Sequence, residues 1–420
     1  MKLLNYKAKV STFSRNVLIV SVGTVIAQVI PSAISPLLTR IYTPEDFGLY
    51  GIYMAIVSLL VTLAAGRYDL AIFIPANVDD SKRLVILSIG LSALFSLLTL
   101  IVIIPFHGWL LNFTSNKEMA IWLYTIPFIV FFISLFQAIS QWLNRIKEYK
   151  QLGILRMTNS GILSGLNLGV GLIYLKVNGL ILSTLITQIL LSLMTVKYLK
   201  SLNASLNIKR LKVLMKRYIN FPKFLLPSTF AGEAAVQVPI LLLTNFFGVT
   251  TSGFFLLANK VLVLPMSVIG NSIGEVYRQE AAEEFYKKGN CTDLYKKTLL
   301  KLAIIGIVPA VVLFFGGKYL FTIVFGVTWT TSGEMASYLS LMLFFQMIST
   351  PMAYTILLVN GQKIDLYLQL GRLTLSILSI VIGGMLNNYK VAIILFSLSY
   401  SLYYVANSLF QYTASKGRSW

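Results

Sequence analysis

The sequence predicts an all-α membrane protein with about 12 transmembrane helices, arranged as two parallel lobes of six. Three observations predict this fold class. Of the 420 residues, 56% are hydrophobic and only 12% are charged, and the mean hydropathy is +0.77, whereas soluble domains carry about 25% charged residues. Apolar runs of the ~20 residues that cross a bilayer recur along the whole chain. A long basic segment near the middle leaves six such runs on either side.

The apolar runs define the predicted spans. The first run is longer than the core of a signal peptide and lacks a cleavage site of small residues, so we expect it to be retained as the first helix. The predicted spans are 16–36, 47–74, 84–105, 119–139, 154–175, 177–196, 222–247, 251–273, 298–316, 335–359, 364–386 and 389–413.

The net charge of +20 is distributed as in a membrane protein rather than as in a nucleic-acid-binding protein. If the N-terminus is cytoplasmic, 25 of the 35 Lys and Arg residues fall in inside segments, counting Lys223 at the start of the seventh span with the segment before it; five fall in outside loops and five others within or at the ends of spans. This excess follows the positive-inside rule. The sequence therefore predicts a multi-pass protein with both termini in the cytoplasm and no nucleic acid partner.

Catalytic and metal-binding residues are scarce. Cys291 is the only cysteine and His107 the only histidine, so a cysteine metal cluster is excluded and a Ser-His or histidine-metal site would depend on one loop residue. No phosphate-binding loop motif occurs. We expect no cofactor and no enzymatic activity.

An internal repeat supports two lobes. The segment LLTRIYTPEDFGLY (37–50) aligns with LLTNFFGVTTSGFF (242–255) at a constant offset of 205 residues. Both copies lie between the first and second spans of their half, which predicts parallel repeats; a chance match between apolar sequences is the alternative. The predicted domains are an N-terminal lobe (1–200), a basic cytoplasmic linker (201–221) and a C-terminal lobe (222–420).

The linker fits two interpretations. Its apolar residues recur at helical spacing among many lysines, as in a helix lying on an anionic membrane surface. A basic linker that simply obeys the positive-inside rule has the same composition.

Ionisable residues inside predicted spans are candidates for function, because each costs roughly 2.5–3.5 kcal/mol at the bilayer centre. Lys260 lies about nine residues, or ~14 Å, into its span, and Glu233 reaches a similar depth from the other side. Three interpretations are open: the two residues form a structural pair, Lys260 lines a substrate path, or the span boundaries are misplaced. Arg372 has no acidic residue nearer on its own helix than Asp365.

Arg67 and Asp69 lie near the cytoplasmic end of the second predicted span. Both could extend to the interface without a further role. Their i, i+2 spacing places them on different faces of a helix, which disfavours a direct ion pair. Gly66 precedes them and would loosen the turn.

The cationic members of this set indicate an anionic substrate. If Arg67, Lys260 and Arg372 line one cavity, phosphate is favoured, because guanidinium groups match phosphate oxygens bidentately. The acidic candidates for coupling to a proton or sodium ion are Glu233 and Asp69.

The fifth predicted span carries glycines at every fourth position: 161, 165 and 169. Such a stripe is typical of a close helix–helix contact. Space for a bulky ligand and a hinge are the alternatives.

Two segments resemble the Wzx-type polysaccharide flippases. Residues 37–75 carry the order of motifs found at the start of those proteins, and 221–281 are similar to the start of their C-terminal lobe, including Pro-x-Ser-x-Ile-Gly. The residues that match the opening pattern are Arg40, Tyr42, Asp46, Gly48, Tyr50, Arg67, Tyr68 and Asp69.

The resemblance implies membership of the multidrug/oligosaccharidyl-lipid/polysaccharide exporter (MOP) superfamily, with a MATE-like fold around a cationic central cavity. It implies translocation of undecaprenyl-diphosphate-linked oligosaccharide repeat units, such as those of O-antigen, across the bacterial inner membrane. The predicted partners are that lipid, the bilayer, and a polymerase and chain-length regulator of lipopolysaccharide assembly. Predicted pyrophosphate or sugar contacts are Arg67, Asp69 and Arg40, which match the family's opening pattern, and Lys260 and Arg372, which match no family motif and are predicted from their burial alone.

Two other functions remain open at this stage. A multidrug antiporter of the same fold would favour an acidic cavity for cationic substrates. A polytopic enzyme, such as a repeat-unit polymerase, would place a catalytic loop outside the membrane, but the longest predicted outside loop (316–334) lacks paired carboxylates.

Overall fold

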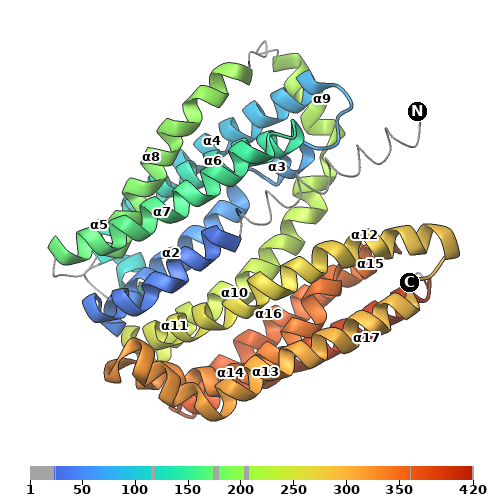
Figure 1. The fold of residues 1–420 in the computed structure, drawn as a ribbon. Coiled ribbons are helices and arrows are strands. Elements are labelled where there is room, and N and C mark those ends of the chain that lie inside the picture. The colour runs from blue at the N-terminus through green and yellow to red at the C-terminus, as the bar shows by residue number, and fades with distance from the viewer. Residues whose placement is uncertain are drawn as a thin grey trace. The chain divides into compact units, whose positions relative to one another are not determined.

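The computed structural model describes residues 23, 25–114, 119–173, 179–202, 208–359 and 361–418, and in this part of the chain every regular element is a helix (Figure 1). Nine of the described helical segments are long and apolar enough to cross a membrane, and two shorter apolar helices accompany them, Val25–Ile41 and Val249–Pro265. A helix satisfies all its backbone hydrogen bonds internally, as a bilayer requires. The chain is therefore a polytopic all-α membrane protein, as predicted.

The principal helices run in chain order as follows: α2 (Pro44–Ala64), α3 (Tyr68–Ala71), α4 (Val78–Thr114), α5 (Ala120–Leu123), α6 (Ile126–Arg145), α7 (Tyr149–Ile173), α8 (Gly179–Leu202), α9 (Ile208–Arg217), α10 (Leu226–Phe247), α11 (Val249–Pro265), α12 (Asn271–Lys288), α13 (Thr292–Phe325), α14 (Thr330–Ser349), α15 (Tyr354–Leu358), α16 (Gln362–Met385) and α17 (Tyr389–Ser415).

The second predicted span was too long. It was expected to continue to residue 74, but α2 ends at Ala64 and the short helix α3 follows. Gly66 and Arg67 between them have φ angles of 56° and 61°, in the left-handed region that interrupts a right-handed helix. The apolar residues after this turn belong to a separate short helix.

The start of α2 explains one residue of the family pattern. The Asp46 carboxylate accepts hydrogen bonds from the Thr43 backbone N–H and hydroxyl, both at 2.8 Å, and the Thr43 hydroxyl accepts one from the Asp46 N–H at 3.2 Å. Pro44, at the first helical position, needs no N–H partner. This reciprocal pairing is a capping box, so Asp46 fixes where the helix begins.

The chain packs into two compact units. Unit 1 contains residues 1–34 and 56–230, and unit 2 contains residues 35–55 and 231–420. Both α2 and α10 therefore contribute residues to each unit. The lobes 1–200 and 222–420 were predicted from the duplication of the sequence and not from compact packing. They remain a prediction.

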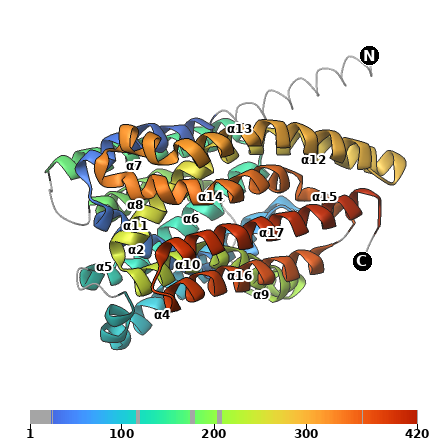
Figure 2. The same ribbon diagram turned by 90° about the horizontal axis from the view of Figure 1, so that it is seen from below.

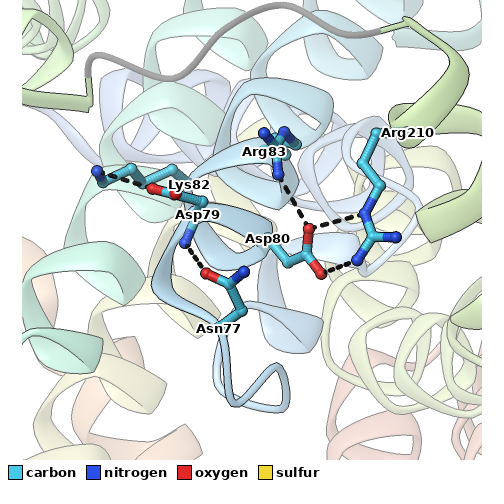
Figure 3. Close-up of polar contacts among 6 residues, drawn as sticks. All are labelled: Asn77, Asp79, Asp80, Lys82, Arg83 and Arg210. Carbon is cyan, nitrogen blue, oxygen red and sulfur yellow. Dashed lines mark hydrogen bonds and ion pairs between the residues drawn. The ribbon is translucent and has the colours of Figure 1, made fainter.

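In unit 1, the basic helix α9 is held against the start of α4 by a buried carboxylate. Asp80 is 4% exposed and lies between two guanidinium groups (Figure 3). Arg210 on α9 contacts both its oxygens, with Nε 3.0 Å from Oδ1, and Arg83 Nη1 lies 3.1 Å from Oδ1. Leu214 of α9 is buried in the same unit's core, and the Tyr68 hydroxyl donates to the Met215 carbonyl.

Asp80→Asn is expected to loosen α9, because it removes the charge that two arginines share. We expect trypsin to cleave the purified protein several-fold faster within α9, where Lys209 and Lys212 are exposed. Asp79→Asn is the matched control, since Asp79 also lies in the first turn of α4, but among the described residues its carboxylate pairs with Lys82 of the same helix alone, at 3.1 Å. Equal cleavage of the two variants would contradict the tethering role.

Unit 2 is built from pairs of long helices. α13 packs along α14, and α16 along α17 (Figure 2). One of its cores joins α12, α13 and the end of α14 around the buried Tyr277, Cys291, Tyr295 and Met352.

The internal repeat forms a reciprocal contact within unit 2. A Cβ added to Gly48 of α2 would collide with the carbonyl oxygen of Val249, and one added to Gly253 of α11 would collide with that of Pro44. Gly48 and Gly253 are 205 residues apart, as are Pro44 and Val249. Each glycine thus accommodates the first helical residue of the other copy, as a two-fold relation between the copies requires.

The glycine stripe of α7 behaves differently. No described atom lies within 4 Å of a Cβ added at 161, 165 or 169. The close packing predicted for the stripe is therefore absent among the described residues.

Candidate functional site

The predicted site residues are distributed between the two units. Arg67 and Asp69 belong to unit 1. The unit 2 members are Arg40, Glu233, Lys260 and Arg372.

Arg67 occupies a strained position at the turn between α2 and α3. Its φ of 61° is uncommon for a residue other than glycine. Its Nε donates a hydrogen bond to the Thr229 hydroxyl at 2.9 Å, while its two Nη groups have no hydrogen bond to any described residue. One edge of the guanidinium is therefore fixed, and the end that binds phosphate bidentately keeps its donors.

Asp69 is buried beside Arg67. It is 5% exposed, and its Oδ1 has no hydrogen-bond partner among the described residues. Burial raises the pKa of this carboxyl above its ordinary value of 3.8, although the Arg67 charge and nearby backbone N–H groups oppose the increase. Because the protonated form is favoured in the folded state, the stability that this group contributes is present at low pH and is lost as pH rises through the raised pKa.

Asp69→Asn should therefore stabilise the protein more at high pH than at low pH. We expect the thermal unfolding temperature in detergent to exceed that of the wild type at pH 8, with the difference shrinking towards pH 4. Asp79→Asn, at an exposed carboxylate that pairs with Lys82, should not raise the unfolding temperature at pH 8. The same difference at pH 4 and pH 8 would contradict the assignment.

Arg372 of α16 is the centre of a polar cluster in unit 2. Its Nη2 donates to the Gly232 carbonyl of α10 at 2.7 Å. Its guanidinium carbon lies 5.8 Å from the ring centroid of Tyr400 and 5.3 Å from that of Tyr403, both on α17. The Tyr400 hydroxyl in turn donates to the Ala235 carbonyl of α10. The cluster therefore links three helices around one permanent charge, which the rings stabilise by cation–π contact.

Two buried polar atoms of this cluster have no partner among the described residues. They are Arg372 Nε and Gln369 Oε1, one a donor and the other an acceptor. Buried polar atoms are normally hydrogen-bonded. A bound polar group that presents both an acceptor and a donor, such as a phosphate and a hydroxyl, would satisfy both.

The tyrosines of this cluster were not predicted from the sequence. The segment SYSLYYVAN places Tyr400, Tyr403 and Tyr404 at i, i+3 and i+4 on one face of a helix. That spacing was the available signal. It shows that the rings share a face, but not which charge they face.

Lys260 and Glu233 do not form the ion pair that the sequence left open. Glu233 accepts a hydrogen bond from Gln237, one turn further along α10, at 2.8 Å. Lys260 is partly buried on α11, and no hydrogen bond or ion pair joins it to a described residue. The sequence-predicted pair is therefore not formed, and Lys260 has no acidic partner among the described residues of unit 2.

Arg40 lies beside the turn that follows α13. Its Nη1 is 2.8 Å from where a Cβ would stand on Gly326, whose φ is 103°. Its predicted substrate contact remains a prediction.

The described residues contain no cluster of three or more His, Cys, Asp or Glu that could hold a metal ion. His107 stacks on Tyr124 with ring centroids 4.9 Å apart. Cys291 is fully buried, and burial raises the pKa of its thiol to about 11. A thiol with that pKa is almost entirely protonated near neutral pH, where it reacts poorly.

Comparison with known proteins identifies both the family and the fold. Residues 37–334 match the family described as polysaccharide biosynthesis protein. No curated protein matches the sequence.

Several solved transporters share the fold. An inward-facing MATE-family multidrug resistance transporter of the MOP superfamily superimposes with a TM-score of 0.72 at 14% identity, over 96% of this chain and 99% of that one. The lipid II flippase MurJ, in an inward closed conformation, gives 0.76 at 13% identity, over 95% and 87%. A MOP-superfamily transporter from Pyrococcus furiosus, described as having a binding pocket of reverse polarity, gives 0.59 at 15% identity, over 96% of each chain.

Proposed function

The chain belongs to the polysaccharide biosynthesis protein family, and on that premise we propose that it is a flippase for undecaprenyl-diphosphate-linked oligosaccharide repeat units. It moves them by alternating access from the cytoplasmic to the periplasmic leaflet of a bacterial inner membrane. The observation that carries the proposal is the combination of this family with the fold of membrane transporters, one of which is the lipid II flippase MurJ. A polysaccharide pathway needs such a step because its lipid-linked units are charged and polar, and cannot cross hydrocarbon unaided.

The charges within the helices support an anionic substrate. Arg372 retains an unpartnered buried donor, and Lys260 has no described acidic partner. A transporter of cationic drugs would gain nothing from such cations, because like charges repel. In this proposal Arg372 and Lys260 attract the pyrophosphate, Gln369 and the tyrosines contact sugar hydroxyls, and Arg67 contacts phosphate where the lipid enters.

Coupling to an ion gradient is a further part of the proposal. Asp69 is the better candidate, since its carboxyl is buried with one oxygen unpartnered. Glu233 is hydrogen-bonded to Gln237, which makes it the weaker one. Both termini are cytoplasmic in this proposal, and the polymerase and chain-length regulator of the pathway act on the flipped product.

The test is the sidedness of the lipid-linked saccharide in living cells. The protein is depleted, and a reagent that reaches only the periplasmic leaflet measures the accessible fraction of complete repeat units. We expect complete but inaccessible units to accumulate, and expression of the wild-type chain to restore their exposure.

Two outcomes would contradict the proposal. Normal exposure of single units together with loss of longer chains would indicate a polymerase. Normal exposure and chain length, with increased sensitivity to cationic drugs, would indicate a multidrug exporter.

A further inference from the structure

We infer that a groove between α12 and α13 binds a bilayer phospholipid with a net negative headgroup. The groove lies within unit 2 and has a volume of about 680 Å³. Its walls are mainly apolar, and three charged side chains line it: Glu280 from α12, and Lys297 and Lys301 from α13. Nothing in the proposed transport step uses this groove, and the inference does not depend on the transported substrate.

The charges of the groove favour an anion. Lys297 and Lys301 are four residues apart, so they lie on the same face of α13 one turn from each other. Both are exposed, and neither forms an ion pair or hydrogen bond with a described residue. Glu280 is also without an ion pair among the described residues, so the lining retains one net positive charge. A headgroup with one phosphate and additional hydroxyl donors would match two ammonium groups and one carboxylate.

The position of the groove along α13 indicates a lipid rather than a soluble anion. Sixteen uncharged residues, 302–317, separate Lys301 from Lys318, a length of about 24 Å in a helix. The two lysines therefore flank most of the ~30 Å hydrocarbon core, with their ammonium groups at the interfaces. Lys301 and Lys297 lie at headgroup depth, and Ile304 and Ile305 of the groove lie one turn deeper, at the level of acyl chains.

Tyr277 lines the groove and is held in place by a hydrogen bond. Tyr277 is 1% exposed, and its hydroxyl forms a 2.7 Å hydrogen bond with the Thr355 hydroxyl. Val276, at 57% exposed, leaves an apolar side wall open. Phosphate at the lysines and an acyl chain along Val276 and the isoleucines would cover the whole groove. Basic pockets between helices at the membrane interface bind anionic headgroups in this manner.

Native mass spectrometry of the full chain in detergent tests the inference. The protein is mixed with equal amounts of phosphatidylglycerol and phosphatidylethanolamine that carry the same acyl chains. We expect wild type to retain phosphatidylglycerol preferentially. Lys297→Gln with Lys301→Gln should reduce that preference about 10- to 30-fold, since each basic residue near an anionic headgroup contributes about fivefold to binding.

Two further variants separate a site from general attraction to positive charge. Lys287→Gln with Lys296→Gln removes two charges from the same helices outside the groove and should retain the wild-type preference. Val276→Trp fills the groove without changing its charge and should reduce retention of phosphatidylglycerol. Equal loss in the two lysine pairs, or unchanged retention in Val276→Trp, would overturn the inference.

Further measurements with competing lipids distinguish which lipid supplies the phosphate that the groove binds. Preferential retention of phosphatidylethanolamine that is lost in Glu280→Gln would show that the groove takes a zwitterion, which overturns the anionic assignment. Displacement of phosphatidylglycerol by equimolar undecaprenyl phosphate would show that the groove takes the polyprenyl carrier instead. Retention of phosphatidylglycerol against both competitors supports the inference.

Discussion

Arg372→Ala is expected to reduce the exposure of lipid-linked units on the periplasmic leaflet by about 10- to 100-fold, since charge-assisted hydrogen bonds contribute roughly 1.5–3 kcal/mol each. The reason is that alanine removes the charge that we propose attracts the pyrophosphate. Arg372→Lys should fall between alanine and wild type. Lysine keeps the positive charge and its contact with the tyrosine rings, but its ammonium group cannot reproduce the planar, forked arrangement of the guanidinium donors. The measurement is the accessibility assay in depleted cells, with each variant expressed at the wild-type level.

The control for this experiment must distinguish binding from packing, because Arg372 also joins α10 and α16 through Gly232. Arg278→Ala is a matched variant, since Arg278 lies 5.6 Å from the ring centroid of Tyr354 but on a helix that is not among the candidate spans. It should transport normally. If Arg372→Ala reduces transport only as far as it reduces the amount of folded protein, the result would contradict a substrate-binding role.

Water access gives an independent measurement at the same position. Cys291, the only natural cysteine, is fully buried with a thiol pKa of about 11, so an introduced cysteine can be followed in the natural background. Arg372→Cys should react with a small charged thiol reagent, and lipid-linked saccharide should slow that reaction. A cysteine at 372 that does not react would show that no aqueous path reaches the site.

The sequence was sufficient to predict the fold because hydropathy measures how favourably a segment transfers from water into the bilayer, which decides whether the segment spans it. Each of the twelve predicted spans overlaps a described helix, including α7, which is not among the nine most apolar segments. The error at the end of the second span has a physical cause. The apolar run continues to residue 74, but two residues with positive φ at Gly66 and Arg67 end the helix earlier, and hydropathy contains no information about backbone angles.

The candidate site was predictable in part. Burial cost identified Arg372 and Lys260 as unusual, since it depends only on charge and depth. It could not identify their neighbours, because helix rotation decides which side chains meet. Glu233 has a depth similar to that of Lys260 but bonds to Gln237 on its own helix. The tyrosines that surround Arg372 come from the next helix along the chain, and only the packed structure brings them together.

The internal repeat makes a second strong prediction: Gly253→Ala and Gly48→Ala should each largely abolish the folded protein. In both cases the new methyl group would meet a backbone carbonyl oxygen at the first position of a helix, which cannot rotate away as a side chain can. Overpacking typically costs about 1–3 kcal/mol and more where backbone must move. The measurements are the yield of monodisperse protein on size-exclusion chromatography and the thermal unfolding temperature.

The reciprocity of the contact sharpens this prediction. Because each glycine accommodates the start of the other copy, the two variants should be destabilised to a similar extent. The double variant should cost less than the sum, since either methyl group alone already separates α2 from α11. Gly316→Ala is the control: its added Cβ would meet only Leu320 side-chain atoms, at 3.5 and 3.7 Å, and should be tolerated. Wild-type stability in Gly253→Ala, or strictly additive losses, would mean that the two copies do not share one contact.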